Sequence, residues 1–415
     1  MTTSSQPSEQ PPFWSAQQAG QLDETLKAPR VQNLQPLSAP RMGRPLRIAL
    51  LGTHGIPSNY GGFETFVEQL SVRLAERGHH VAVYCRSYST TYREKYFKGV
   101  RLFKLPTVRT KQLDTLAHTF LSMLHGFFRR YDVVYICGVG NAPLAFIPRM
   151  TGKPTLINVD GADWQRDKWG KFAKWYLHVS ERAAVRNATH IISDSRVVER
   201  YYLENYKTPS IYIPYGSDVP LVPPGATLQQ FGLKPKGYIL WVGRLVPENN
   251  CHDVIAAYQR LGGPATGLQL CILGDSPYSD EYIKNLKANA GPGVVFTGYV
   301  FGSGYHELGA NARIFAFACG VGGTHPALLE AMSRGNCIIT NDMNANLETV
   351  GDAAIPYHGE GHADALTEVL GHVIASPALI DEYSRRAAHR AATVYNWEVI
   401  TTQYEKLFYD LAQKK

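Results

Sequence analysis

A strand-then-helix rhythm constrains the fold of this chain more than any other feature of the sequence. Short apolar runs alternate with longer segments in which apolar residues recur at helical spacing. In the first half, the predicted strands are 46–51, 80–85, 132–137, 154–159 and 189–193, and the predicted helices are 62–77, 113–130, 171–188 and 195–206. Alternation of this kind predicts a parallel, doubly wound α/β sheet.

The same rhythm resumes after a Pro-rich segment, so the chain is predicted to have two lobes. We expect a disordered tail over 1–44, a first lobe over 45–217, a linker over 218–225, a second lobe over 226–394, and a helix over 395–415 that returns to the first lobe. In the second half, the predicted strands are 237–242, 268–273, 294–297, 312–317 and 336–340, and the predicted helices are 250–261, 279–289, 326–334 and 362–374.

Length and composition agree with a two-domain protein that has ordinary cores. The chain has 415 residues, and 44% of them are hydrophobic. No apolar run reaches the roughly 18 residues that cross a bilayer, and the polar N-terminus argues against secretion. A short helix is expected near Ala19–Lys27. The six cysteines are scattered without a CxxC pair, which predicts buried, reduced thiols in a cytoplasmic protein.

Charge is distributed unevenly between the two halves. Residues 44–215 contain 25 Lys and Arg against 13 Asp and Glu, a net charge of +12. Residues 216–415 contain 14 against 19, a net charge of −5. This asymmetry predicts an anionic partner for the first half only.

Two glycine-containing loops each precede a predicted helix. Gly61 and Gly62 follow the first strand, and Gly323-Thr324-His325 precede Pro326, with Thr324 a candidate N-cap. A helix N-terminus presents free backbone N–H groups and the positive end of the helix dipole to an anion such as a phosphate. Two such loops in two α/β halves predict one phosphate-bearing ligand held between the lobes, which favours a nucleotide-sugar enzyme. Ordinary helix capping explains each loop taken alone.

Residues 45–415 resemble the retaining family-four glycosyltransferases, which have the GT-B fold of two facing Rossmann-like lobes. The shared motifs are Gly-Gly-Phe-Glu at 61–64, Glu-Arg-Gly-His at 76–79, Ile-Pro-Tyr-Gly at 213–216, Val-Gly-Arg-Leu-Val-Pro-Glu at 242–248 and Leu-Leu-Glu-Ala-Met at 328–332. This resemblance implies transfer of a sugar from a nucleotide donor with retention, without a covalent enzyme nucleophile.

The chain is similar in particular to the bacterial rhamnosyltransferase branch of that family. The motifs of this branch are Gly-Thr-His-Gly-Ile-Pro at 52–57, Asn-Val-Asp-Gly at 158–161, Lys-Trp at 168–169 and Gly-Gly-Thr-His-Pro at 322–326. The similarity implies TDP-rhamnose as donor, and a lipid-linked or polysaccharide acceptor in cell-surface glycan biosynthesis.

The resemblance also implies roles for residues of the second lobe. Glu330 would accept hydrogen bonds from ribose hydroxyls, and Arg244 would neutralise the leaving diphosphate. Two positions depart from the wider family. Gly322 replaces a glutamate that contacts the donor sugar, and Asn249 stands where a lysine binds the diphosphate. The rhamnosyltransferase branch looks similar at both positions, so we keep Asn249 among the expected donor-binding residues.

The acceptor side is expected on the first lobe. Asp160 ends a predicted strand at the edge where open α/β sheets bind ligands, which favours a catalytic carboxylate over one that only caps a loop. Glu64 and Asp163 are further candidates for a role on the acceptor side, because they are expected to lie near Asp160. Trp164 and Lys168 belong to the basic and aromatic run 164–176.

That run predicts peripheral binding to an anionic membrane on the cytoplasmic face, because aromatic rings suit the interface and Lys and Arg suit the headgroups. Arg129 and Arg130, which follow Phe127 and Phe128, extend the pattern. A helix with a buried aromatic stripe and a solvated basic face is the alternative. No nucleic-acid motif accompanies the basic charge. No cofactor and no metal is expected, since the chain lacks a D-x-D-type carboxylate pair.

Three alternatives remain open at this stage. The donor could be another nucleotide sugar, linked to UDP or GDP. The chain could be a two-lobed nucleotide-sugar epimerase, which needs no acceptor. It could also be a non-catalytic binding protein that keeps the fold, as the departures at Gly322 and Asn249 would allow. A dehydrogenase is poorly supported, because Gly52–Gly55 lacks the GxGxxG spacing.

Overall fold

The computed structural model of the chain describes residues 43–58, 61–90, 92–108, 110, 113–159, 170–277, 279–359 and 363–413. Most of the predicted tail lies outside these residues, and so does the helix expected near Ala19–Lys27. The predicted acceptor-side residues Asp160, Asp163, Trp164 and Lys168 also lie outside them, so their roles stay predictions.

An eight-stranded sheet forms the centre of the first lobe, which we define as this sheet and the helices that cover it. The strand order is β3-β4-β2-β1-β5-β6-β7-β8, and all neighbours are parallel except β3 and β4. The strands are β1 Arg47–Leu51, β2 His80–Arg86, β3 Tyr96–Phe97, β4 Val100–Leu105, β5 Val133–Cys137, β6 Thr155–Val159, β7 His190–Ser193 and β8 Ile211–Tyr212.

A six-stranded sheet forms the centre of the second lobe, defined in the same way. Its order is β11-β10-β9-β12-β13-β14, and every pairing is parallel. The strands are β9 Tyr238–Val242, β10 Gln269–Leu273, β11 Val294–Gly298, β12 Ile314–Phe317, β13 Cys337–Asn341 and β14 Ile355–Tyr357. The predicted class, two doubly wound α/β lobes, is confirmed.

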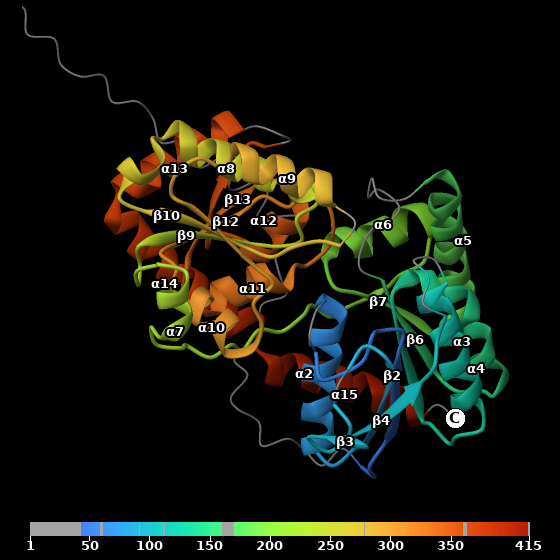
Figure 1. The fold of residues 1–415 in the computed structure, drawn as a ribbon. Helices are drawn as coiled ribbons and strands as arrows, with labels where there is room; N and C mark the ends of the chain where they lie inside the picture. Colours follow the sequence, from blue (N-terminus) through green and yellow to red (C-terminus); the bar gives the residue numbers. More distant parts are fainter. Residues whose placement is uncertain are drawn as a thin grey trace, which may run out of the picture. The chain divides into compact units, whose positions relative to one another are not determined.

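Helices connect the strands in both lobes (Figure 1). In the first lobe they are α2 Gly62–Glu76, α3 Asp114–Phe127, α4 Phe146–Met150, α5 Lys171–Asn187 and α6 Arg196–Tyr206. The helices that follow are α7 Ala226–Gln230, α8 Cys251–Arg260, α9 Asp280–Asn289, α10 Gly302–Asn311, α11 Pro326–Ser333, α12 Asn344–Val350, α13 Ala363–Ala375, α14 Pro377–Val394 and α15 Trp397–Gln413.

Strand β1 shows why the first sheet is covered on both faces. Ile48 and Leu50 belong to the buried cluster that includes residues of α2 and α15, whereas Ala49 and Leu51 belong to the cluster with residues of α3 and α5. Successive side chains of a strand point to opposite faces, so a fully apolar strand requires cover on both sides. Figure 1 shows α2 and α15 on one side of this sheet and α3, α4 and α5 on the other.

The C-terminal helix α15 returns to the first lobe, as predicted. It packs on α2 and β5, and its Tyr404 and Phe408 are fully buried. Glu405 accepts hydrogen bonds from Arg77 Nη1 at 2.7 Å and contacts His79 Nε2 at 2.9 Å. These polar contacts join the end of α2 and the residue before β2 to the last helix of the chain.

The expectation missed several short elements, for physical reasons. Helix α10 contains three glycines, at 302, 304 and 309, which disfavour a helix when it is judged alone. Strand β4 alternates buried Val100 and Leu102 with partly exposed residues, which is typical of a strand near a sheet edge. Strands β3 and β8 contain two residues each, too few for a recognisable period.

Within the described parts of the chain, no single helix is long and apolar enough to cross a membrane. The helix pair Ala363–Ala375 and Pro377–Gln413, bent by 102°, satisfies the criterion by length and composition only.

Candidate functional site

The two predicted glycine loops lie against each other. Gly62 begins α2 directly after the N-cap Gly61, and Pro326 begins α11. A Cβ atom added to Gly62 would lie 3.2 Å from Pro326 Cγ, so the two helix starts are in close contact. The structure therefore brings together the two loops that the sequence analysis singled out, one from each lobe.

A carboxylate already occupies the space beside the first loop. Glu64 is buried, and its Oε1 accepts a hydrogen bond from the His54 N–H at 2.8 Å. A side chain at Gly61 would collide with Glu64 Oε2, at 2.1 Å from the added Cβ, and the φ of 107° at Gly61 also requires glycine. Burial raises the pKa of Glu64. Glu64 thus folds back over the start of its own helix.

A second carboxylate, Asp194, occupies the loop before α11. Its Oδ2 accepts a hydrogen bond from the Thr324 N–H at 3.2 Å, and its backbone carbonyl accepts one from Thr324 Oγ1 at 2.7 Å. A Cβ at Gly323 would lie 2.6 Å from Asp194 Oδ1. The prediction of Thr324 as N-cap is wrong, because its hydroxyl donates to Asp194 and the N-cap position is held by His325.

His325 makes no side-chain capping bond to α11, and its ring lies 5.0 Å from that of Phe317, measured between centroids. The sequence analysis did not identify Asp194. The available signal was its position directly after β7, at the carboxyl edge of the first sheet.

A third carboxylate, on α12 of the second lobe, binds the start of a helix in the first lobe. Glu348 on α12 accepts hydrogen bonds from the Arg196 N–H at 2.7 and 2.9 Å and from the Val197 N–H at 3.2 Å. These N–H groups lie in the first turn of α6, where the helix dipole favours a negative charge. Burial raises the pKa of Glu348. Asp194 and Glu348 therefore each bind the start of a helix in the other lobe.

Glu330 is held by two neighbours, the buried Arg334 and the partly buried Tyr305. Its Oε2 accepts hydrogen bonds from Tyr305 Oη at 2.5 Å and from Arg334 Nη2 at 3.1 Å. Its side chain is 15% exposed, whereas that of Arg334 is 2% exposed. Neither Tyr305 nor Arg334 was predicted, although Arg334 follows Glu330 at the i+4 spacing of a helical ion pair. The two partners fix the direction in which Glu330 faces.

The loop after β9 carries Arg244, which is half-buried. Its backbone carbonyl accepts a hydrogen bond from Asn249 Nδ2 at 2.8 Å. Asn249 Oδ1 in turn accepts one from Cys319 Sγ at 3.1 Å. The amide of Asn249 therefore holds the Arg244 loop and ties it to the chain just after β12.

A buried charged cluster lies at the carboxyl ends of β1 and β2. Arg86 is 3% exposed and donates to Asp114 Oδ2 at 2.6 Å and to Thr115 Oγ1 at 2.8 Å. The hydroxyl of Tyr88 also donates to Asp114. Burial and the charge of Arg86 lower the pKa of His54 to about 4. At neutral pH this histidine is therefore uncharged, and Arg86 and Asp114 carry the opposing charges of the cluster.

In the described residues, no group of three or more His, Cys, Asp or Glu side chains is arranged to hold a metal ion. The six cysteines are buried and none of them forms a disulfide, in agreement with the sequence analysis.

Two family models match the chain in succession. Residues 46–218 match a model described as a domain of unknown function, DUF1972, and residues 227–392 match the model of glycosyl transferases group 1. The two matched segments contain all strands of the first and second sheets, respectively.

One curated relative and two solved structures are similar to most of the chain. The GDP-mannose-dependent alpha-(1-6)-phosphatidylinositol monomannoside mannosyltransferase of Mycolicibacterium smegmatis is 24% identical over 379 residues, which are 86% of this chain and 94% of that protein. Sucrose-phosphate synthase from Thermosynechococcus elongatus superposes with a TM-score of 0.77 at 20% identity, covering 89% of this chain and 100% of the other. Anabaena HepE in complex with UDP-glucose superposes with a TM-score of 0.71 at 17% identity, covering 87% and 99%.

Proposed function

We propose that this chain, a glycosyltransferase of the GT-B fold whose residues 227–392 form a group 1 domain, transfers a sugar from a nucleoside diphosphate with retention of configuration. The observation that carries the proposal is the contact of Gly62 with Pro326, which brings two helix N-termini to one place. A diphosphate at this place would meet N–H groups and positive dipole ends from both lobes.

Donor binding requires one exchange of partners. The diphosphate takes the place of the Asp194 carboxylate at the Thr324 N–H, with Gly61, Gly323 and His325 around it. Asp194 makes a charge-assisted bond of 3.2 Å there, so a phosphate oxygen of like charge suits the same donor. Glu330 binds the ribose, and Arg244 neutralises the leaving diphosphate.

The reaction proceeds on one face of the donor sugar. The bond between the anomeric carbon and the phosphate oxygen breaks, and the acceptor oxygen bonds to the same face of that carbon. The acceptor proton passes to the departing diphosphate, so no enzyme nucleophile is required. Asp160, which follows the last residue of β6, orients the acceptor hydroxyl or stabilises the positive charge that develops on the sugar.

The donor is proposed to be TDP-rhamnose, on the strength of the motifs shared with the rhamnosyltransferase branch. The named relatives offer other donors, since one is GDP-mannose-dependent and another was solved with UDP-glucose. A thermal-shift series with TDP, UDP, GDP and ADP separates these choices, because a ligand that binds only the folded state raises its apparent stability. TDP is expected to stabilise most. A preference for GDP or UDP would replace the rhamnose assignment and leave sugar transfer intact.

Product analysis tests sugar transfer itself. The full chain is incubated with labelled TDP-rhamnose, with and without a polyprenyl-diphosphate-linked sugar, and the label is followed into nucleotide, free sugar and lipid fractions. Transfer requires label in the lipid fraction. A changed nucleotide sugar without acceptor would indicate an epimerase, and tight binding without turnover would indicate a binding protein.

The acceptor is proposed to be lipid-linked and to be reached at the cytoplasmic face of the membrane. The exposed end of α5 carries Phe172, 77% exposed, and Trp175, 59% exposed, with ring centroids 5.6 Å apart. Lys171 and Lys174 alternate with them. Exposed rings beside lysines suit an anionic bilayer interface, where each basic residue contributes about 1 kcal/mol.

A matched pair of variants tests this membrane contact. Tyr299 and Phe301 in the second lobe form a similar exposed aromatic pair, with centroids 5.6 Å apart. Phe172→Ala with Trp175→Ala is expected to reduce sedimentation with anionic vesicles several-fold, and Tyr299→Ala with Phe301→Ala to leave it unchanged. Binding should weaken as salt rises. An equal effect of the two double variants, or equal binding to neutral vesicles, would remove the proposed contact.

A further inference from the structure

A hollow of about 710 Å³ lies at the opposite edge of the first sheet from the candidate site. Arg47 begins β1 and His80 begins β2, and both line it, together with Asp132 just before β5 and Lys153 just before β6. The loops of the candidate site follow the other ends of these strands. Five-residue strands rise about 17 Å in total, so the hollow is separate from the candidate donor and acceptor positions.

Positively charged side chains line much of this hollow. It is lined by Arg44, Arg47, Arg129, Arg130 and Lys153, and among its described lining residues Asp132 carries the only carboxylate. That carboxylate pairs with Arg44, whose Nη2 lies 2.6 Å from Oδ1. The lining therefore keeps a large excess of positive charge, which concentrates anions at its surface.

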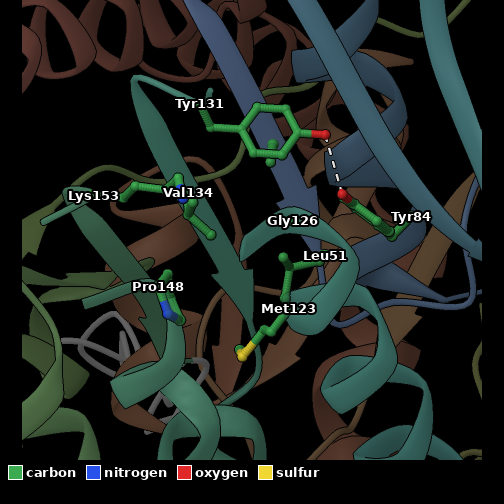
Figure 2. A pocket seen from close by; sticks show the side chains of 9 residues that line it. Leu51, Tyr84, Met123, Gly126, Tyr131, Val134, Pro148 and Lys153 are labelled. Carbon is green, nitrogen blue, oxygen red and sulfur yellow. Dashed lines mark hydrogen bonds between the residues drawn. The ribbon is translucent and has the colours of Figure 1, made fainter. Parts of the chain in front are cut away.

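The inner wall of the hollow is close-packed. Lys153 and Tyr131 also line the neighbouring cavity of Figure 2, whose volume of about 10 Å³ holds no more than a water molecule. In that wall the hydroxyl groups of Tyr131 and Tyr84 form a hydrogen bond of 3.1 Å. Lys153 Nζ donates a hydrogen bond to the Phe127 carbonyl at 2.9 Å. Phe128, 79% exposed, adds an apolar surface to the lining. A ligand is therefore confined to the open, cationic part.

We propose that this hollow binds a phosphoryl group, carried either by a free phosphate compound or by the headgroup of an anionic lipid. Arginine side chains form forked, charge-assisted hydrogen bonds with phosphate oxygens. Arg47 and Arg130 are available for this, since neither guanidinium takes part in a hydrogen bond or ion pair among the described residues. The site does not depend on the proposed sugar transfer.

Two double variants of the full chain isolate the hollow. Arg47→Gln with Arg130→Gln removes two lining charges without breaking a described side-chain contact. Arg93→Gln with Arg200→Gln removes two exposed charges of the same lobe outside the hollow. Both variants keep the candidate donor loops, so any pyrophosphate bound there contributes equally to both.

Calorimetry with inorganic pyrophosphate measures the free-phosphate source, and co-sedimentation with phosphatidylcholine vesicles with and without phosphatidic acid measures the lipid source. Arg47→Gln with Arg130→Gln is expected to weaken the binding of pyrophosphate, of phosphatidic acid vesicles, or of both by about tenfold or more. The control variant is expected to change the binding of either probe less than twofold. A loss confined to pyrophosphate assigns a soluble ligand, and a loss confined to vesicles assigns a lipid headgroup. Equal weakening in both variants, or no saturable binding of either probe, would overturn the proposal.

Discussion

At the start of α6 and just before α11, a carboxylate from the other lobe accepts hydrogen bonds from backbone N–H groups. Glu348 serves α6 and Asp194 serves Thr324 just before α11, each from the other lobe, whereas Glu64 in the first turn of α2 accepts from the N–H of His54, which lies before that helix. A helix N-terminus attracts an anion, and a protein carboxylate provides one for the start of α6 and beside the start of α11. In the proposed donor site, a diphosphate therefore has to displace the Asp194 carboxylate from the Thr324 N–H.

Asp194→Asn tests this displacement at the scale of one residue. The amide oxygen keeps an acceptor for Thr324 but loses the charge that competes with the diphosphate. Loss of a competing charge at a helix start, worth about 1 kcal/mol, is expected to tighten nucleoside diphosphate binding about fivefold in calorimetry. Asp218→Asn, at the exposed pair with Arg73, serves as the control. Weaker binding in Asp194→Asn would instead make Asp194 a support of the donor site.

His118 gives a residue-scale prediction for pH. It is fully buried on α3, and burial lowers its pKa to about 4 from 6.5. Between these values the unfolded chain takes up a proton that the folded chain does not, so lowering the pH destabilises the fold. At pH 5 this amounts to about 2 kcal/mol for one group. In urea unfolding, His118→Gln is expected to show a shallower loss of stability from pH 7 to pH 5. Parallel pH profiles of variant and wild type would refute this.

At the scale of elements, α15 completes the core of the first lobe. Phe408 is fully buried, and its ring contacts those of Tyr404 and Tyr135, with centroids 6.0 and 6.4 Å away. Phe408→Ala leaves a cavity and is expected to cost about 3–5 kcal/mol in urea unfolding. Lys406→Ala, on the exposed face of the same helix, should change stability by less than about 0.5 kcal/mol. If Phe408→Ala is as mild as the control, α15 does not belong to the core of the first lobe.

At the scale of the whole molecule, the proposed function assigns the nucleotide to the second lobe and the acceptor to the first lobe. Asp160→Asn preserves size and hydrogen bonding and removes charge. Turnover is expected to fall by roughly 10²-fold, the scale of general-base contributions, while the dissociation constant for the nucleotide stays unchanged. Single-turnover rates and calorimetry measure the two quantities separately. Loss of nucleotide affinity with an unchanged rate would place Asp160 on the donor side.

The sequence by itself determined the elements whose patterns are local. The longer strands and helices follow from apolar runs and helical periods, and the glycine loops before α2 and α11 follow from short motifs, because each pattern lies within one segment. The fold class, with α15 on the first lobe, followed from this rhythm and from the family resemblance.

Tertiary structure alone decided what fills the candidate site. Asp194 lies 130 residues before Thr324, and Glu348 lies 152 residues after Arg196. A helix start needs an acceptor but does not specify where in the chain that acceptor lies. The lining of the cationic hollow was likewise decided by the tertiary structure, because its residues lie at or near the starts of β1, β2, β5 and β6. Parallel strands bring their starting residues together at one edge of a sheet, although those residues are distant in sequence.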